Sequence, residues 1–195
     1  MSELAHIASM RIIAGTFKGR RLASPRKATI RPTLDRVKES YFRIVHTQVQ
    51  GANFLDLCAG SGNIGLEALS RGAQQVAFVD QNRQSIRLIK TNLQKCGLTS
   101  QDQRIQLLPT DVKRSLTTFS RSQVQFHLIY FDPPYTSDLY LECLTQIAET
   151  TVLTKRGIIC IEHNQSDFPQ HIGGLRLTKE KKYGGTNLSF YQMEV

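Results

Sequence analysis

Short apolar runs alternate with segments of helical periodicity from Asn53 onward, and this alternation restricts the chain to few folds. Five runs have the length and composition of strands: Phe54–Leu57, Val76–Val79, Ile105–Leu108, Leu128–Phe131 and Gly157–Ile161. Such apolar runs are typical of parallel strands that are buried on both faces. Strands that alternate with helices predict a doubly wound α/β sheet. Two later strands, Leu175–Glu180 and Asn187–Met193, predict a closing antiparallel hairpin.

Length and composition predict one well-cored domain with a small appendage. The chain has 195 residues, of which 40% are hydrophobic and 21% charged, as in globular proteins. No apolar run has the length of a membrane helix, and the first residues do not resemble a signal peptide. The four cysteines are scattered and form no metal-binding pattern. We therefore expect a cytoplasmic protein, a monomer, that needs no membrane and no metal.

A basic excess is confined to one segment near the amino terminus. Ten basic and two acidic residues lie between Met10 and Arg43, so this segment carries +8 of the chain's net charge of +9. Turn residues within Arg11–Leu22 predict a small β-hairpin, and Thr33 is expected to cap a helix that runs to Val45. Localised positive charge favours a nucleic-acid partner because neutralised phosphates release counterions, although a solvated arm would carry the same charge. The candidate RNA-binding residues are Arg11, Lys18, Arg20, Arg21, Arg26, Lys27, Arg31, Arg36 and Lys38.

A glycine-rich loop follows the first strand of the alternating region. Gly60, Gly62 and Gly65 match G-x-G-x-x-G at a strand-to-helix turn, where a nucleoside cofactor meets a helix amino terminus. Asp80 ends the second strand, where a carboxylate can accept hydrogen bonds from a ribose. This pattern suits NAD equally well, and a tight turn without a ligand would also need glycines. Asp56, facing a cationic amine, and Asp111, near an adenine amino group, favour S-adenosylmethionine.

The stretch His127–Tyr135 predicts an amine-binding loop at the carboxyl end of a central strand. Pro133 and Pro134 lack N–H groups and end the strand ladder after Asp132. Asp132 and the Pro133 carbonyl can accept hydrogen bonds from an exocyclic amine, and Tyr135 can stack on the base. An Asp-Pro-Pro-Tyr loop gives no help to a hydride transfer. An ordinary Pro-Pro turn after a strand-end acid is the structural alternative.

Several segments together resemble the RsmD family of bacterial methyltransferases. They are MRIIAGTFKGRRL (Met10–Leu22), RPTLDRVKESYF (Arg31–Phe42), LDLCAGSGNIGLEALSRGA (Leu55–Ala73), FVDQN (Phe78–Asn82), FDPPY (Phe131–Tyr135) and YGGTNLSFY (Tyr183–Tyr191). Members use S-adenosylmethionine to methylate the N2 amine of one guanine in 16S ribosomal RNA of the small subunit, and are thought to prefer assembly intermediates.

The resemblance implies a class I S-adenosylmethionine-dependent methyltransferase fold: Rossmann-like, with a seven-stranded, mostly parallel sheet, an antiparallel closing hairpin and a small basic amino-terminal extension. It divides the chain into a possible extension (1–9), a basic RNA-binding hairpin and helix (10–48) and the methyltransferase core (49–195). The implied target-amine site is Asp132, Pro133, Pro134 and Tyr135. The implied cofactor site is Asp56, Cys58, Ala59, Gly60, Ser61, Gly62, Asp80, Gln81, Asp111 and Val112.

Three other classes remain open at this point. A methyltransferase of DNA adenine N6 or of a protein glutamine would share Asp132–Tyr135 but has no need of this basic arm. An NAD-dependent oxidoreductase would share the glycine loop and Asp80. A non-catalytic RNA-binding module would keep the arm but has no reason to keep Asp132 and Tyr135 together.

Overall fold

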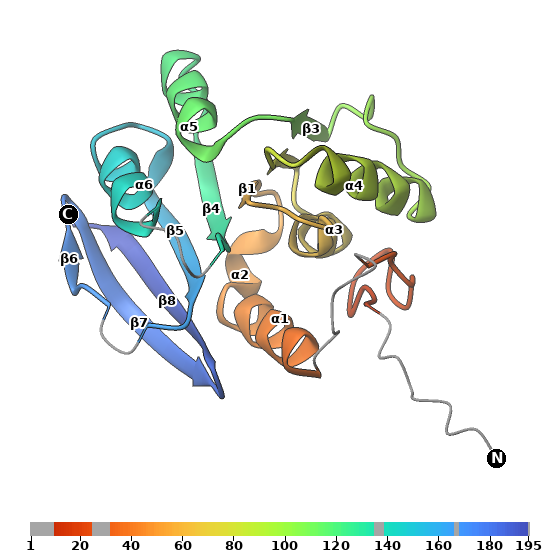
Figure 1. The fold of residues 1–195 in the computed structure, drawn as a ribbon, viewed down its shortest axis with the longest axis horizontal. Coiled ribbons are helices and arrows are strands. Elements are labelled where there is room, and N and C mark those ends of the chain that lie inside the picture. The colour runs from red at the N-terminus through yellow and green to blue at the C-terminus, as the bar shows by residue number, and fades with distance from the viewer. Residues whose placement is uncertain (1–9, 25–31, 135–138, 166–167, 195) are drawn as a thin grey trace.

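The structure is a computed structural model that describes residues 10–24, 32–134, 139–165 and 168–194. Within these residues there are eight strands: β1 (Asn53–Leu57), β2 (Gln75–Val79), β3 (Ile105–Leu108), β4 (Phe126–Phe131), β5 (Leu153–His163), β6 (His171–Ile172), β7 (Leu175–Tyr183) and β8 (Thr186–Met193). They form one sheet in the order β3-β2-β1-β4-β5-β8-β7-β6 (Figure 1). Strands β1 to β5 are parallel, whereas β8, β7 and β6 pair antiparallel at one edge.

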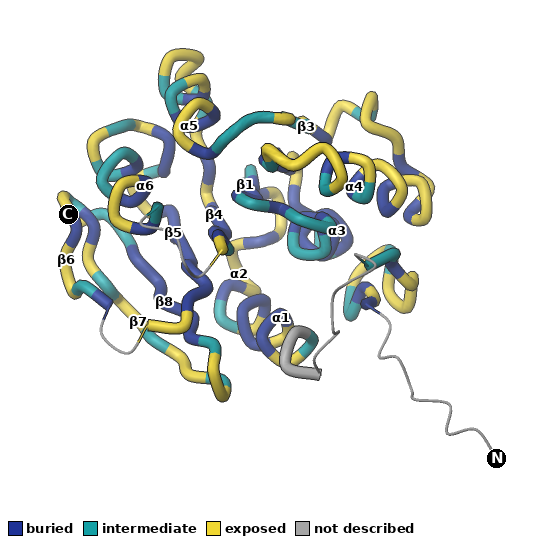
Figure 2. The backbone as a smooth tube through the Cα atoms, in the orientation of Figure 1, coloured by how far each residue is buried: buried dark blue, intermediate teal, exposed yellow. Residues whose placement is uncertain are grey.

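Helices cover both faces of this sheet. The described helices are α1 (Pro32–Ile44), α2 (His46–Val49), α3 (Asn63–Ser70), α4 (Arg83–Lys95), α5 (Val112–Arg121) and α6 (Leu139–Ala148). Side chains of β1 alternate between the faces: Phe54 packs with α1 to α4, and Leu55 packs with α5 and α6. The result is a three-layer α/β/α fold whose central strands are buried (Figure 2).

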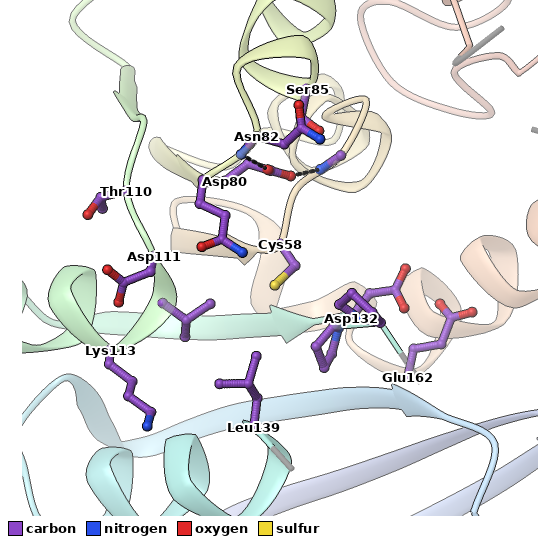
Figure 3. Close-up of a pocket in the computed structure, with 15 residues that line it drawn as sticks. Cys58, Asp80, Asn82, Ser85, Thr110, Asp111, Lys113, Asp132, Leu139 and Glu162 are labelled. Atoms are coloured by element: carbon purple, nitrogen blue, oxygen red, sulfur yellow. Dashed lines mark hydrogen bonds between the residues drawn. The ribbon is translucent and has the colours of Figure 1, made fainter. Parts of the chain in front are cut away.

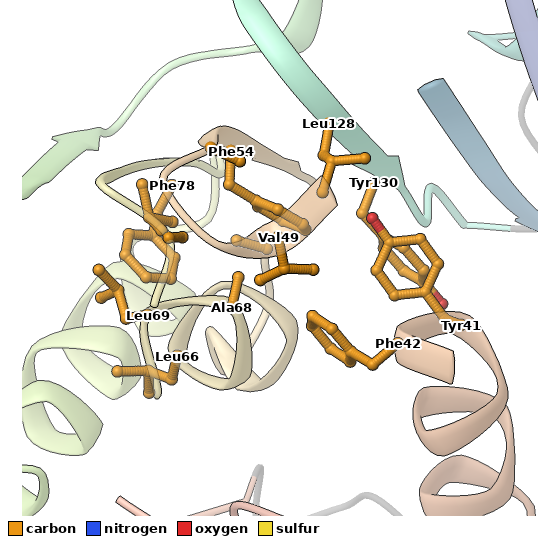
Figure 4. Packing of buried hydrophobic residues seen from close by; sticks show 14 of the residues in the cluster. Tyr41, Phe42, Val49, Phe54, Leu66, Ala68, Leu69, Phe78, Leu128 and Tyr130 are labelled. Carbon is orange, nitrogen blue, oxygen red and sulfur yellow. The ribbon is translucent and has the colours of Figure 1, made fainter. Parts of the chain in front are cut away.

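Helix α1 contributes to the core beside the sheet. Its Tyr41 and Phe42 are fully buried and lie against Phe54 and Tyr130 (Figure 4). Helix α1 therefore buries an apolar face against the sheet. The helix begins at Pro32, so Thr33 lies inside its first turn instead of capping it; proline suits this position because its missing N–H has no partner there.

The basic arm, residues 10–24, is a turn and not a pair of strands. One antiparallel bridge joins Arg11 to Arg21, and the Ile12 amide donates to the Arg20 carbonyl at 3.0 Å. Gly15 and Gly19 both have positive φ, and they curl the segment too tightly for two strands. The predicted hairpin is thus shorter than expected.

The arm shares its core with the sheet. Ile12 is 1% exposed and belongs to the same hydrophobic cluster as Phe54 and Phe78. Ala23 donates its amide to the Asn92 side chain of α4 at 2.7 Å. The residues on the two sides of the predicted boundary at residue 48 therefore share one hydrophobic core. The division into an RNA-binding part and a methyltransferase core stays a prediction about function. The predicted extension, residues 1–9, lies outside the described residues.

Two sequence predictions about the sheet are wrong in detail. The described sheet has eight strands instead of seven, because the two residues of β6 pair with the start of β7; so short a strand leaves no periodic signal. Strand β5 begins at Leu153, not Gly157. Leu153 is buried and pairs with Phe126, so the tertiary contact with β4 extends the strand.

Candidate active site

The glycine loop, Cys58–Gly62, connects β1 to α3 at the carboxyl edge of the sheet. Gly62 has φ +74° at the amino end of α3, a conformation that other residues rarely adopt. Gly65 has a different role: a Cβ there would lie 2.3 Å from the Phe78 ring. The loop glycines thus permit a sharp turn and the close approach of α3 to β2.

Asp80, at the end of β2, fixes the conformation of this loop. Its carboxylate accepts the Gly60 amide at 2.9 Å and the Asn82 amide at 2.8 Å (Figure 3). Asn82 in turn caps α4 by accepting the Gln84 amide. A carboxylate has about four lone-pair sites, so Asp80 can also accept hydrogen bonds from a ligand.

A cavity of about 840 Å³ lies over the carboxyl ends of the parallel strands. It brings together nine of the predicted site residues: Cys58, Gly60, Asp80, Gln81, Asp111, Val112, Asp132, Pro133 and Pro134. Leu139 and Glu162 line it as well (Figure 3). Asp111 is the capping residue of α5, where its carboxylate accepts the Arg114 amide at 2.9 Å. This is the edge at which open α/β sheets bind ligands.

A smaller cavity of about 210 Å³ adjoins the first between α1, the arm and the sheet. Asp56, Ala59 and Ser61 line only this smaller cavity, whereas Cys58, Gly60, Asp132 and Glu162 line both. Gly62 lines neither and donates its amide to the Ala59 carbonyl at 2.7 Å. The predicted cofactor residues thus divide between two connected spaces and the turn that supports them.

Asp56 is a buried carboxyl group at the inner end of the smaller cavity. It is 2% exposed and accepts the Gly65 amide at 2.9 Å. Burial raises its pKa to about 8, with a further contribution from the charge of Asp80. A cationic ligand group beside Asp56 would favour the ionised carboxylate. The site is therefore suited to a positively charged amine.

Asp132 lies where β4 ends. Its amide donates to the Leu57 carbonyl at 3.3 Å, which continues the β1–β4 pairing by one residue. Burial raises the pKa of its carboxyl group, and the charges of Glu162 and Asp56 raise it further. Pro133 is buried and Pro134 is exposed. Tyr135 lies outside the described residues.

Glu162, at the end of β5, lines both cavities and was not among the site residues predicted from the sequence. It is 5% exposed and accepts the Tyr130 hydroxyl at 2.5 Å. Its only signal in the sequence was an acid at a strand end, as at Asp80 and Asp132. The strand order places β5 beside β4, and so brings Glu162 next to Asp132.

The structure separates the predicted RNA-binding residues into three groups. Arg11, Lys18, Arg20, Arg21 and Arg36 are exposed, and the Arg20 guanidinium donates to the Lys95 carbonyl at 3.2 Å. Arg26, Lys27 and Arg31 lie outside the described residues. Lys38 contradicts its prediction, because it is 1% exposed and forms an ion pair with Glu67 at 3.3 Å. Its ammonium group also donates to the Asn63 side chain at 2.8 Å and lies inside the protein, not on the exposed surface of the arm.

No group of metal-ligating side chains occurs among the described residues, and none of the helices in that part of the chain is long and apolar enough to cross a membrane.

Comparisons with known proteins agree with this architecture. A family model described as "Conserved hypothetical protein 95" matches residues 10–192. "Putative rRNA methyltransferase YlbH" of Bacillus subtilis is 37% identical over 184 residues, which cover 94% of this chain and 98% of that protein. "Ribosomal RNA small subunit methyltransferase D" of Haemophilus influenzae is 30% identical, covering 94% of this chain and 93% of its own.

A solved structure shows the same fold. "Putative methyltransferase yhhF" from Escherichia coli has a TM-score of 0.80 and 25% identity, covering 96% of this chain and 99% of its own. The fold is thus that of class I methyltransferases, as predicted. Because the family model and these relatives span nearly the whole chain, the protein belongs to the RsmD family.

Proposed function

We propose that the protein transfers a methyl group from S-adenosylmethionine to the N2 amine of a guanine in 16S ribosomal RNA, within the small subunit or an assembly intermediate. The observation that carries this proposal is the position of Asp132, which borders the large cavity at the end of β4. The names of the relatives support an RNA substrate of the small subunit. On this reading the protein acts in the cytoplasm as a monomer without a metal.

The residues present fit the cofactor. The large cavity has a volume typical of small-molecule sites and offers carboxylates at two neighbouring strand ends, Asp80 and Asp111. In the proposed complex Asp80 accepts ribose hydroxyls and Asp111 an adenine amino group. Asp56 faces the methionyl amine from the smaller cavity. The bound cofactor supplies a methyl group on a cationic sulfur, which becomes neutral on transfer.

Asp132 has the task of preparing the amine. The N2 lone pair of guanine is delocalised into the ring, so the nitrogen is a weak nucleophile. By accepting an N2–H bond, the Asp132 carboxylate favours the pyramidal geometry in which the lone pair is available. The Pro133 carbonyl can accept the second N–H. When nitrogen bonds to the methyl carbon, the carbon–sulfur bond electrons stay on sulfur, and a proton leaves nitrogen through Asp132 to water.

The exposed basic side chains provide the surface that binds RNA. Arg11, Lys18 and Arg21 lie on the arm, whose ends at Met10 and Ser24 border the smaller cavity. Cations at this place can hold phosphates on either side of a guanine taken out of its stack.

Transfer of labelled methyl from S-adenosylmethionine tests the proposal directly. Small subunits from cells that lack the enzyme, large subunits, bulk tRNA and DNA are offered in parallel. We expect label only in small-subunit RNA, released on digestion as N2-methylguanine. Label in DNA, or in protein, would overturn the proposal in favour of another amine.

Two sets of variants separate the roles of Asp132 and the arm. Asp132→Ala should abolish turnover while cofactor affinity changes little; loss of cofactor binding would contradict the assigned role. Reversing the charge of Arg20 and Arg21 should weaken RNA binding and reduce its salt dependence. An unchanged salt slope would exclude the arm as the RNA contact.

A further inference from the structure

Glu162 and Asp132 form a pair of carboxyl groups on neighbouring strands. Phe131 of β4 pairs with Ile161 of β5, so the next residue on each strand follows side by side. Both side chains line both cavities, and Figure 3 shows them close together. In the strand order, Glu162 lies beyond Asp132 on the side away from Asp80 and Asp111. It therefore lies on the acceptor side of the site.

The core fixes the position of Glu162. Its side chain accepts the Tyr130 hydroxyl at 2.5 Å, and Tyr130 is 1% exposed beneath the strand ends. The Glu162 backbone carbonyl accepts the Tyr140 hydroxyl from α6 at 3.4 Å. The two oxygens of a carboxylate have about four lone-pair sites, so a hydrogen bond from a buried tyrosine does not prevent a carboxylate from accepting one from a ligand.

The chemistry of guanine matches two adjacent acceptors. Its Watson–Crick edge presents N1–H next to the N2 amine, so two donors lie side by side. Adenine presents one amine next to N1, which is an acceptor without hydrogen. A pair of carboxylates would satisfy the first edge and repel the second.

We propose that Glu162 accepts the N1–H of the target guanine while Asp132 accepts its N2–H, so that the pair selects guanine. This inference rests on the proposed function and adds to it the residue that reads the base. Burial and mutual repulsion raise the pKa of Asp132. Two base N–H groups would offset this repulsion, which makes a bound guanine the natural partner of the pair.

A base that keeps the amine but loses the N1 hydrogen tests the inference. 2-Aminopurine is such a base. The methylated nucleotide is first located by label in wild-type reactions. Small subunits are then reconstituted with RNA carrying guanine or 2-aminopurine at that position, and kcat/KM is measured for both. We expect wild type to prefer guanine by more than tenfold; equal rates for the two bases would overturn the inference.

Glu162→Gln provides the second measurement. The glutamine side chain can turn its amide to donate to N1 of 2-aminopurine, so the preference for guanine should fall by about tenfold or more. The ratio of kcat/KM for guanine to kcat/KM for 2-aminopurine is compared between variants, which cancels the intrinsic difference in reactivity of the two amines. Glu149→Gln, an exposed change just after α6, is the matched control and should keep the wild-type preference.

Tyr130→Phe tests whether Glu162 has only a structural role. It removes the hydroxyl bound to Glu162 but keeps the carboxylate, so rates should fall while the preference for guanine persists. If Glu162→Gln only lowers both rates equally, as Tyr130→Phe would, Glu162 supports the fold and does not read the base. Failure of wild type to methylate any guanine would refute the proposed function itself, and is distinguishable from these outcomes.

Discussion

Glu67 of α3 accepts two amides of the amino-terminal arm and pairs with Lys38 of α1, so neutralising Glu67 should release the arm. Glu67 is fully buried. Its two oxygens accept the Ile13 amide at 2.8 Å, the Ala14 amide at 3.0 Å and the Arg71 guanidinium at 2.8 Å, besides pairing with Lys38. In Glu67→Gln one of these oxygens becomes an NH₂ group, which would then face a donor.

The magnitude follows from these contacts. Removing one partner of a buried ion pair costs about 3–5 kcal/mol, because the other charge stays buried. A hydrogen bond to a charged group contributes about 1.5–3 kcal/mol, but these amounts overlap and do not add. We therefore expect Glu67→Gln to lower the free energy of unfolding by about 3–5 kcal/mol. For a chain of this size, that corresponds to a fall in Tm of about 6–20 °C.

Urea unfolding followed by circular dichroism measures this loss, and tryptic cleavage at Arg20 and Arg21 reports release of the arm. Glu149→Gln is the control, since Glu149 is exposed. Adding Lys38→Met to Glu67→Gln removes the unpaired charge and should restore part of the stability. A loss below about 1 kcal/mol, or no recovery in the double variant, would refute the reasoning.

Three further perturbations test other parts of the fold. Asp56→Asn should flatten the pH dependence of the free energy of unfolding. The Asp56 carboxyl group has a pKa of about 8 in the folded protein against an ordinary 3.8, so the stability that it contributes is full below pH 3.8 and is lost as pH rises toward 8. An unchanged profile of urea midpoint against pH would contradict this. Gly15→Ala should lower the free energy of unfolding by several kcal/mol, since its Cβ would lie 1.7 Å from the Ser70 carbonyl oxygen. Gly19→Ala, at nearly the same φ but in open space, should lower it by only about 1 kcal/mol. Equal urea midpoints for the two variants would refute the clash. Asp80→Asn should weaken cofactor binding at least about tenfold, as measured by calorimetry. The asparagine side chain offers one acceptor oxygen to the two backbone N–H groups that the Asp80 carboxylate now accepts. An unchanged Kd would exclude Asp80 from the site.

Local signals placed most of the predicted cofactor residues at one edge of the sheet. The glycines of the loop are needed for backbone geometry and close packing, and both requirements are visible in a short stretch of sequence. Asp80 and Asp132 follow apolar runs, and parallel strands carry their carboxyl ends to one edge of the sheet. For these residues, position along the chain was enough to predict position in space.

The sequence by itself determined the fold class, the edge of the sheet that carries the candidate site, and the basic character of the arm, because periodicity, strand breakers and charge act locally. Only the tertiary structure decided that Lys38 is buried, since its partner Glu67 lies on a different helix. It also decided that Glu162 joins Asp132, since that depends on β5 lying beside β4 in register. Both contacts link segments far apart in the chain, and such contacts form only when the packed core fixes which segments meet.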